Sequence, residues 1–284
     1  MAKLDVRNRL CLVTGATGGI GAATARELAN RGARLILTDL DQTSLNELAA
    51  ELKSRGVDVP VALAVDLTDA GKVKEFAAQV QDKVGSIDLI FNIAGISIWG
   101  SIERLQEEHW RRLIDINLMG PVNVLSAFVP PMIQARRGGH IVNVSSAAGI
   151  FGLPWHAGYS ASKFGLRGIS EVLRFDLRKH RIGVSLVCPG AVATPLVETL
   201  EVVGVDRSAP AVKAVEKQFI RHAVTPEHAA KEILKGVERR KYWVYTSPDI
   251  RIGHLAQRWV PWGYEYVMRM MNRQLSRAVA GIDQ

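Results

Sequence analysis

Residues 14–21 read TGATGGIG, a glycine-rich turn that follows the apolar run RLCLVT (9–14) and precedes a segment with helical spacing. Its glycines include Gly15, Gly19 and Gly21. Because glycine lacks a Cβ atom, the backbone can turn sharply there and let a pyrophosphate approach. The free N–H groups of the helix N-terminus also favour an anion. A glycine cluster alone is often just a tight turn, but between the first strand and first helix of an α/β chain it predicts a dinucleotide site.

Beyond this turn, apolar runs alternate with helical patterns along the chain. We expect strands at 9–14, 33–39, 59–66, 87–95, 139–146 and 182–190, and helices at 23–32, 43–56, 69–85, 107–136 and 159–180. Strands this apolar are typically buried on both faces, and repeated strand–helix–strand units imply a parallel sheet covered by helices on each side. With right-handed crossovers, the pattern predicts a doubly wound α/β sheet of the Rossmann type in a single domain.

Polar residues end the second, third and fourth expected strands. Asp39 lies eighteen residues beyond Gly21, Asp66 ends the third strand, and NIAG (92–95) ends the fourth. Ligands bind at the carboxyl ends of such strands, where an acid accepts hydrogen bonds from ribose hydroxyls and repels a 2′-phosphate. No Arg or Lys stands at position 40 or inside the glycine turn, so the sequence favours NAD(H) over NADP(H). The alternative is that Asp39 only caps the second helix, a role open also to Asp41.

The composition fits a soluble globular protein with a reducing, cytoplasmic location. Of 284 residues, 48% are hydrophobic and 23% are charged, and we expect neither a secretory signal nor a spanning helix. Cys11 and Cys188 lie in separate apolar runs without metal-ligand spacing, so we expect two buried thiols and no metal site. The net charge of +8 is uneven, because residues 207–284 carry fourteen basic and seven acidic residues. Basic residues alternate with acids there, which argues against nucleic acid binding.

The order and spacing of several motifs resemble those of the short-chain dehydrogenase/reductase family, in the branch with a core of about 250 residues. These motifs are TGATGGIG, NIAG, Asn117 in DINLMG, NVSS, YSASK (159–163) and CPGAVATP, and the resemblance covers roughly residues 8–240. It implies a seven-stranded parallel sheet, and homodimers or homotetramers built from helix pairs and the last strand. The family usually has a second asparagine where this chain has Ile93, a change expected to weaken local hydrogen bonding around the fourth strand.

The resemblance also implies a set of site residues. The catalytic set would be Asn117, Ser146, Tyr159 and Lys163, with Ser146 thirteen residues before Tyr159 and Asn117 holding a proton-relay water. The cofactor set would be Gly15, Thr17, Gly19, Ile20, Gly21, Asp39, Asp66, Leu67, Asn92, Ala94, Gly95, Tyr159, Lys163, Pro189, Gly190, Val192 and Thr194. In this set Asp66 lies near the adenine ring, and Val192 and Thr194 touch the nicotinamide amide.

The chemistry of Tyr159 and Lys163 fits alcohol oxidation or ketone reduction. Residues i and i+4 share a helix face, so both side chains point into the same space. A free tyrosine is a poor base at neutral pH, and a nearby ammonium favours the phenolate. Tyr159 would then be the base for oxidation and the acid for reduction, while Ser146 orients the substrate oxygen. The bland alternative, a packed ring beside a snorkelling lysine, is disfavoured once Ser146, Asn117 and the glycine turn are counted.

Segments beside the expected site are mostly apolar, which favours a hydrophobic secondary alcohol or ketone as substrate. They contribute Ile96, Ile98, Trp99, Phe151, Leu153 and Trp155. Residues 194–205 are expected to begin a mobile lid. His156, three residues before Tyr159, is either an extra acid or substrate contact, or a surface or packing residue, and we favour the second.

We divide the chain into a catalytic domain at 1–245 and a helical extension at 246–284. The extension mixes Trp, Tyr and Met with Arg, and such a segment either lies on an anionic membrane as a peripheral contact or packs against the active site or a sister subunit. We favour packing. For the whole chain, the leading function is an NAD(H)-dependent oxidoreductase. The alternatives are an NADPH-dependent ketoreductase and a dinucleotide-binding sensor or scaffold without turnover.

Overall fold

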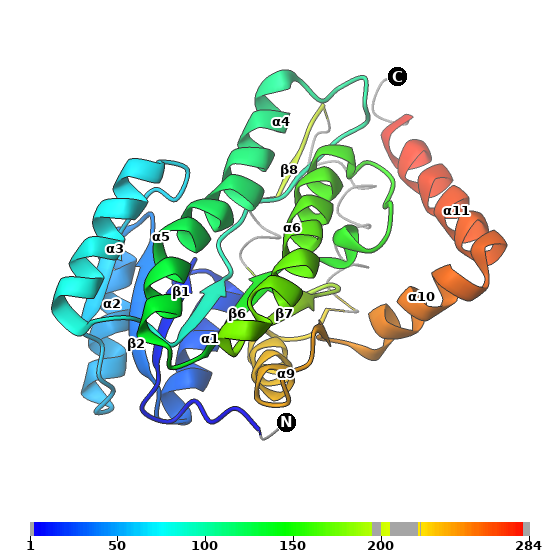
Figure 1. Ribbon diagram of the computed structural model, residues 1–284. Helices are drawn as coiled ribbons and strands as arrows, with labels where there is room; N and C mark the ends of the chain where they lie inside the picture. The colour runs from blue at the N-terminus through cyan, green and yellow to red at the C-terminus, as the bar shows by residue number, and fades with distance from the viewer. Residues whose placement is uncertain (1–2, 195–199, 205–220, 222, 281–284) are drawn as a thin grey trace.

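The computed structural model describes residues 3–194, 200–204, 221 and 223–280. Within these residues, seven parallel strands form one sheet with the order β3-β2-β1-β4-β6-β7-β9 (Figure 1). The strands are β1 (Leu10–Thr14), β2 (Arg34–Asp39), β3 (Val61–Ala64), β4 (Leu89–Asn92), β6 (Gly139–Val144), β7 (Ile182–Cys188) and β9 (Trp243–Tyr245). The predicted doubly wound, seven-stranded sheet is therefore confirmed.

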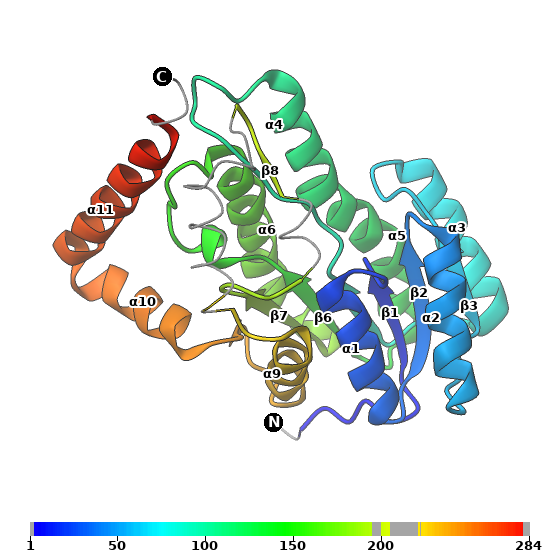
Figure 2. The same cartoon turned by 180° about the vertical axis from the view of Figure 1, so that it is seen from behind.

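Helices cover both faces of the sheet. One face carries α1 (Gly19–Asn30), α2 (Gln42–Ser54) and α9 (Pro226–Glu238), and the other carries α3 (Ala70–Val84), α5 (Gly120–Ala135) and α6 (Ala157–Asp176) (Figures 1 and 2). The helix α4 (Glu107–Ile114) precedes α5, extends beyond the sheet and packs on α6. Two further helices, α10 (Pro248–Trp259) and α11 (Pro261–Ala280), follow the last strand. The chain winds outward from β1 to β3 and then from β4 to β9, so the strand order reverses between β1 and β4, which is where such sheets bind ligands.

Alternate residues of each strand enter different cores, which explains why the strands read as continuous apolar runs. In β1, Cys11 and Val13 join the core beneath α1, α2 and α9, while Leu10 and Leu12 join the core beneath α3, α5 and α6. Both cysteines are buried and unpaired, as the sequence indicated, and burial raises the pKa of each thiol.

The single helix expected at 107–136 is two helices joined by a π-helical turn, Asp115–Met119. The Gly120 N–H donates to the carbonyl oxygen of Asp115, five residues earlier. The whole segment Glu107–Ala135 is long and apolar enough by composition to cross a membrane, but α4 packs on α6 and α5 packs on α3, as expected of a core helix. A small sheet that the sequence did not predict pairs β5 (Ile98–Trp99) with β8 (Glu201–Val202).

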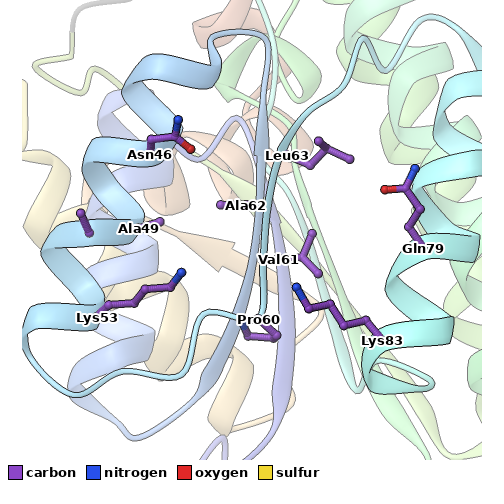
Figure 3. Close-up of a pocket in the computed structure, with 10 residues that line it drawn as sticks. Asn46, Ala49, Lys53, Pro60, Val61, Ala62, Leu63, Gln79 and Lys83 are labelled. Carbon is purple, nitrogen blue, oxygen red and sulfur yellow. The ribbon is translucent and has the colours of Figure 1, made fainter.

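The free edge of β3 is shielded rather than left open to another strand. The Gln42 side chain accepts a hydrogen bond from the Ala64 N–H at 2.8 Å and donates to the Ala62 carbonyl at 3.3 Å, so its amide replaces a neighbouring strand. Figure 3 shows the groove beside this edge, where Lys53 from α2 and Lys83 from α3 extend from opposite walls. These charges disfavour edge-to-edge pairing with another sheet.

His140 lies at the amino end of β6, where it is fully buried. Its imidazole is neutral at pH 7. The Ser185 hydroxyl donates to the Lys241 carbonyl at 2.6 Å, so it accepts at 2.8 Å from the Nε2–H of His140. This leaves Nδ1 without a proton, and no described residue bonds to it. Burial, reinforced by the charge of Arg240, lowers the pKa of His140 from 6.5 to about 3.

We therefore expect His140 to make the protein less stable as the pH falls. Above pH 6.5 the histidine is neutral in both states, but below it the unfolded chain binds a proton that the folded chain excludes. Folding should lose up to ~1.4 kcal/mol per pH unit between pH 6.5 and about 3. Urea midpoints at pH 7 and pH 4.5 should differ less in His140→Gln than in wild type. The exposed His228→Gln should match wild type, and equal pH slopes in all three proteins would contradict this.

Candidate active site

The glycine turn between β1 and α1 has no room for larger residues. Gly15 has φ +63°, and a Cβ atom there would lie 2.7 Å from the Ala94 Cα. A Cβ on Gly21 would lie 1.8 Å from the Gly15 carbonyl oxygen. The backbone of the turn therefore lies directly against itself and against Ala94. The first N–H groups of α1 lie at the cleft that is described below. No acidic residue occupies the first turn of α1, so the end of this helix suits an anion.

Asp39, at the end of β2, is tied to the same turn. One carboxylate oxygen accepts from the Thr17 N–H at 2.9 Å and the Thr17 hydroxyl at 2.6 Å, and the other accepts from the Leu40 N–H at 2.8 Å. The capping residue of α2 is Asp41, which accepts from Thr43 and Ser44. The alternative role for Asp39 as the cap of this helix is therefore wrong.

A cleft of about 590 Å³ opens along the carboxyl ends of β1, β2, β3 and β4. The expected cofactor residues that line it are Gly15, Gly19, Ile20, Gly21, Asp39, Asp66, Leu67, Ala94, Gly95 and Thr194. Hydrogen bonds from Thr68 lower the pKa of Asp66, so this carboxyl is ionised at neutral pH. The glycine cradle, the open helix end and these carboxylates together fit a dinucleotide.

Other expected cofactor residues do not line this cleft. Asn92 is buried and donates to Asn143 at 2.9 Å, Pro189 accepts from the Ala147 N–H at 2.7 Å, and Val192 pairs with Val224. Gly190 lies against α10, because a Cβ there would come 2.9 Å from an Ile250 side-chain carbon. These four residues do not belong to the lining of this cleft.

The sequence reasoning missed Thr14, which organises the loop after β4. Its hydroxyl donates to the Phe91 carbonyl at 3.4 Å and accepts from the N–H groups of Ile93 and Ala94 at 3.1 and 3.2 Å. The Ile93 side chain packs on the core beneath α1. The hydrogen bonds to Thr14 come from backbone N–H groups, so they do not depend on the side chain at position 93. Thr14 is the first residue of TGATGGIG, so the motif contained it. Its role could not be predicted, because its hydrogen-bond partners lie about eighty residues further along the chain.

Ser146, Tyr159 and Lys163 come together at the carboxyl end of β6. Ser146 follows the strand, hydrogen-bonds to Tyr159 and accepts from the Ala148 N–H at 3.1 Å. The Lys163 ammonium donates to the Val144 carbonyl at 3.2 Å and lies 5.7 Å from the centre of the Tyr159 ring. The neighbouring Ser145 points the other way and donates to the Lys163 carbonyl at 3.0 Å. The spacing of YSASK therefore does place the phenol and the ammonium in one space.

The electrostatics differ from the expectation in one respect. Burial raises the pKa of Tyr159, although the hydrogen bond with Ser146 acts to lower it. Burial also lowers the pKa of Lys163 to about 8. The ammonium was expected to lower the tyrosine pKa, but here it is itself desolvated and bonded to a backbone carbonyl. Tyr159 is therefore a neutral phenol at pH 7.

Asn117 enters the same site from the π-helical turn. Its amide donates to the Ile96 carbonyl and accepts from the Ile96 N–H, both at 2.9 Å, and also donates to Ser162 at 3.2 Å. A Cβ on Gly95 would lie 2.8 Å from the Asn117 Oδ1 and 3.3 Å from the Lys163 Nζ. Only glycine at position 95 therefore lets the asparagine amide and the lysine ammonium face the same small space.

His156 is a buried packing residue. Its ring lies 4.2 Å from that of Trp99, centre to centre, and its Nδ1 is bonded to the Pro154 carbonyl at 2.6 Å. Burial lowers the pKa of His156 to about 4, so it carries no extra proton at neutral pH. This geometry favours the packing interpretation over an additional acid.

The expected substrate-pocket residues divide into two groups. Ile96 lines the cleft and packs near Tyr159, whereas Ile98 and Phe151 are buried in the interior. Of the expected lid at 194–205, residues 195–199 and 205 lie outside the described residues. Among the residues that are described, no three His, Cys, Asp or Glu side chains gather as metal ligands would.

Comparison with known proteins agrees with this arrangement. The family model for short chain dehydrogenases matches residues 9–202. The 3-oxoacyl-[acyl-carrier-protein] reductase FabG of Thermotoga maritima is 38% identical over 197 residues, which cover 69% of this chain and 79% of that protein.

Solved structures match over a greater length. A short chain dehydrogenase/reductase from Burkholderia phymatum in complex with NAD has TM-score 0.81 and 25% identity, covering 90% of this chain and 94% of that one. A short-chain dehydrogenase from Sphingobium yanoikuyae in complex with NADPH has TM-score 0.73 and 27% identity, covering 92% and 95%. The chain thus belongs to the short-chain dehydrogenase/reductase family and is an oxidoreductase that acts on CH–OH groups with NAD(P).

Proposed function

We propose that this protein is an NAD(H)-dependent oxidoreductase that interconverts a hydrophobic secondary alcohol and its ketone. The observation that carries the proposal is the meeting of Ser146, Tyr159 and Lys163 at the end of β6, beside a cleft that ends on the Asp39 carboxylate. A binding protein without turnover has no chemical need for these three groups together.

In the proposed mechanism, Tyr159 moves the proton of the substrate oxygen. The Ser146 hydroxyl hydrogen-bonds to Tyr159 and would orient the same substrate oxygen. In reduction the neutral phenol is already the correct form to donate. In oxidation it must first lose its proton, a change that a nearby positive charge favours. A nicotinamide, when bound, supplies or accepts the hydride.

Lys163 and Asn117 would support that proton transfer. With its pKa lowered to about 8, Lys163 still carries a proton at pH 7 yet releases it more easily than an exposed lysine. Asn117 Oδ1 faces the same space beside Gly95, so the pair suits a water that links the ammonium to solvent. Lys163 would also hold the nicotinamide ribose.

The preference for NAD(H) rests on Asp39 and on the uncharged Leu40 beside it. A carboxylate at this strand end accepts from ribose hydroxyls and repels a 2′-phosphate. We expect wild type to bind NADH at least about tenfold more tightly than NADPH, a difference of ~1.4 kcal/mol. Isothermal titration should show Asp39→Asn narrowing this ratio several-fold, because the amide keeps one acceptor for Thr17 but loses the charge.

Asp58→Asn is the matched control, since it removes the charge of another acid, one that is exposed and pairs with Arg34 away from the cleft. Equal or tighter binding of NADPH by wild type would favour the alternative of an NADPH-dependent ketoreductase. A panel of secondary alcohols and ketones then tests turnover. The panel should also include small charged alcohols. If the protein bound the cofactor but turned over no compound of the panel, the sensor or scaffold alternative would replace the enzyme.

A hydrophobic substrate is supported by the apolar surroundings of Tyr159. This residue packs, together with Ile96, Trp110 and Val203, against the buried cluster of Ile98, Leu105 and Leu113. The buried free thiols of Cys11 and Cys188 suit a reducing compartment, so we propose a cytoplasmic location. Assembly as a homodimer or homotetramer is likewise a proposal, drawn from the family.

A further inference from the structure

The helices α10 and α11, here named the C-terminal arm, are held to the rest of the protein along one side. Ile250 packs in a cluster with Phe151, and the His254 Nδ1 is hydrogen-bonded to the Tyr245 hydroxyl at 2.8 Å. Further along, the Tyr264 hydroxyl accepts from the Gly152 N–H at 2.8 Å. Figures 1 and 2 show the two helices running along the outside of the molecule beyond the sheet, with α10 turning into α11 at a corner.

The opposite side of α10 is an uncovered apolar stripe. Ile252, Leu255 and Trp259 stand at i, i+3 and i+7, so they share one helix face. They are 65%, 55% and 76% exposed. α10 is described over its whole length and buries none of its residues. This stripe points away from Ile250 and His254, the residues that anchor the helix.

α11 continues the exposed apolar surface. Trp262, Tyr266 and Met270 stand at i, i+4 and i+8 and are 76%, 68% and 44% exposed. The stripe on α10 ends at Trp259 and this one begins at Trp262, so two large exposed indoles flank the corner between the helices. Exposed aliphatic and aromatic side chains in such a row indicate a surface that something else covers.

Arginines accompany both stripes. Arg251 and Arg258 are exposed on α10, and the Arg258 guanidinium lies 5.9 Å from the centre of the Trp259 ring. Arg269 and Arg273 are exposed on α11. Among the described part of the arm the acids are Asp249 and Glu265, and Glu265 is already bonded to Arg269 at 3.0 Å. The outer surface of the arm therefore combines apolar groups with unbalanced positive charge.

We propose that the outer face of the C-terminal arm binds the surface of an anionic lipid bilayer. Indoles and aliphatic side chains enter the boundary between headgroups and acyl chains, while arginines contact anionic headgroups. A second copy of this chain fits less well. A two-fold contact would bring the same arginines of both copies together, with too few acids to balance them. The arm is a peripheral contact, since both helices carry too many charges to span.

The test is sedimentation of the full-length protein with sucrose-loaded vesicles of phosphatidylcholine, with and without phosphatidylglycerol. The protein should pellet with the anionic vesicles, and high salt should release it. Trp259→Ala with Trp262→Ala should weaken binding about tenfold or more. Phe164→Ala with Phe175→Ala is the matched control, because these rings are also exposed but lie on α6.

The charge contribution is tested separately. Arg251→Gln with Arg258→Gln should weaken binding to anionic vesicles about tenfold and leave the weak binding to phosphatidylcholine unchanged. Arg55→Gln with Arg111→Gln should behave as wild type, because Arg55 follows the end of α2 and Arg111 lies on α4, both away from the arm. Circular dichroism should show that all variants are folded, as expected for exposed positions.

Three results would overturn the proposal. One is wild-type protein that stays in the supernatant with anionic vesicles. Another is equal loss of binding in the control variants, which would indicate nonspecific attraction to a basic protein. The third combines two observations: wild type does not bind vesicles, and light scattering shows that Trp259→Ala with Trp262→Ala, alone among the variants, forms a smaller oligomer than wild type. That result would identify a second copy as the occupant.

Discussion

Tyr159→Phe is expected to lower turnover by about 10²- to 10⁴-fold, the range that a positioned general acid or base contributes. Phenylalanine keeps the ring that packs against the cluster of Ile98, Leu105 and Leu113, so the shape of the site should persist. It removes the hydroxyl that is hydrogen-bonded to Ser146 and lies near Lys163. The dinucleotide cleft lies along β1 to β4 and is lined by other residues, so NADH affinity should change less than about threefold.

Tyr242→Phe is the matched control for this prediction. The Tyr242 hydroxyl is buried with no hydrogen-bond partner among the described residues, and its ring packs against Arg174 away from the cleft. Its loss should leave turnover unchanged. Initial rates with the best substrate of the panel, together with NADH titration, measure both quantities. Wild-type turnover in Tyr159→Phe would remove this residue from the mechanism, whereas loss of NADH binding would indicate a structural defect instead.

Gly21→Ala is expected to abolish measurable binding of either cofactor. The added Cβ would lie 1.8 Å from the carbonyl oxygen and 2.8 Å from the carbonyl carbon of Gly15. Gly15 cannot move aside, because it has φ +63° and its own Cα faces the backbone of Ala94. The turn must therefore open, which displaces the N–H groups that would hold a pyrophosphate. Overpacking of this kind also costs about 1–3 kcal/mol of stability, or more when the clash is with backbone.

Gly168→Ala separates this clash from a general effect of glycine replacement. Gly168 is also helical, but nothing lies within 4 Å of a Cβ built there. Alanine at this exposed helix position should stabilise the fold by about 0.5–1 kcal/mol. Thermal unfolding and cofactor titration of both variants provide the comparison. Wild-type affinity in Gly21→Ala would mean that the turn does not form the phosphate site.

The sheet could be predicted from the sequence because each strand is buried on both faces, and this leaves a continuous apolar run within the strand itself. In β1, neighbouring residues enter different cores, so the run is apolar throughout and contrasts with the helices around it. The strand β9 has only three residues, Trp243–Tyr245, and came from the family resemblance rather than from its pattern. The pairing of β5 with β8 joins segments about a hundred residues apart, and nothing in either segment predicts the other.

The site was predictable where function depends on spacing and not where it depends on long-range contacts. Tyr159 and Lys163 meet because four residues make one helical turn. The pKa of Tyr159 could not be predicted, because it is set by burial among residues from several elements. Thr14 was missed for the same reason, since its partners belong to the end of β4. The arm was expected to be helical, but only the structure shows which of its faces is uncovered.

The π-helical turn at Asp115–Met119 has a consequence for insertions and deletions. A turn closed by a bond from Gly120 to Asp115 holds one residue more than an α-helical turn would. Deleting one residue in this stretch would let it close as a regular α-helical turn, so α4 and α5 would keep nearly the same relative orientation. The side chains inside the turn would change their angular positions, and Asn117 would then turn away from Gly95. The length of this segment is thus constrained as much as the chemistry of its residues.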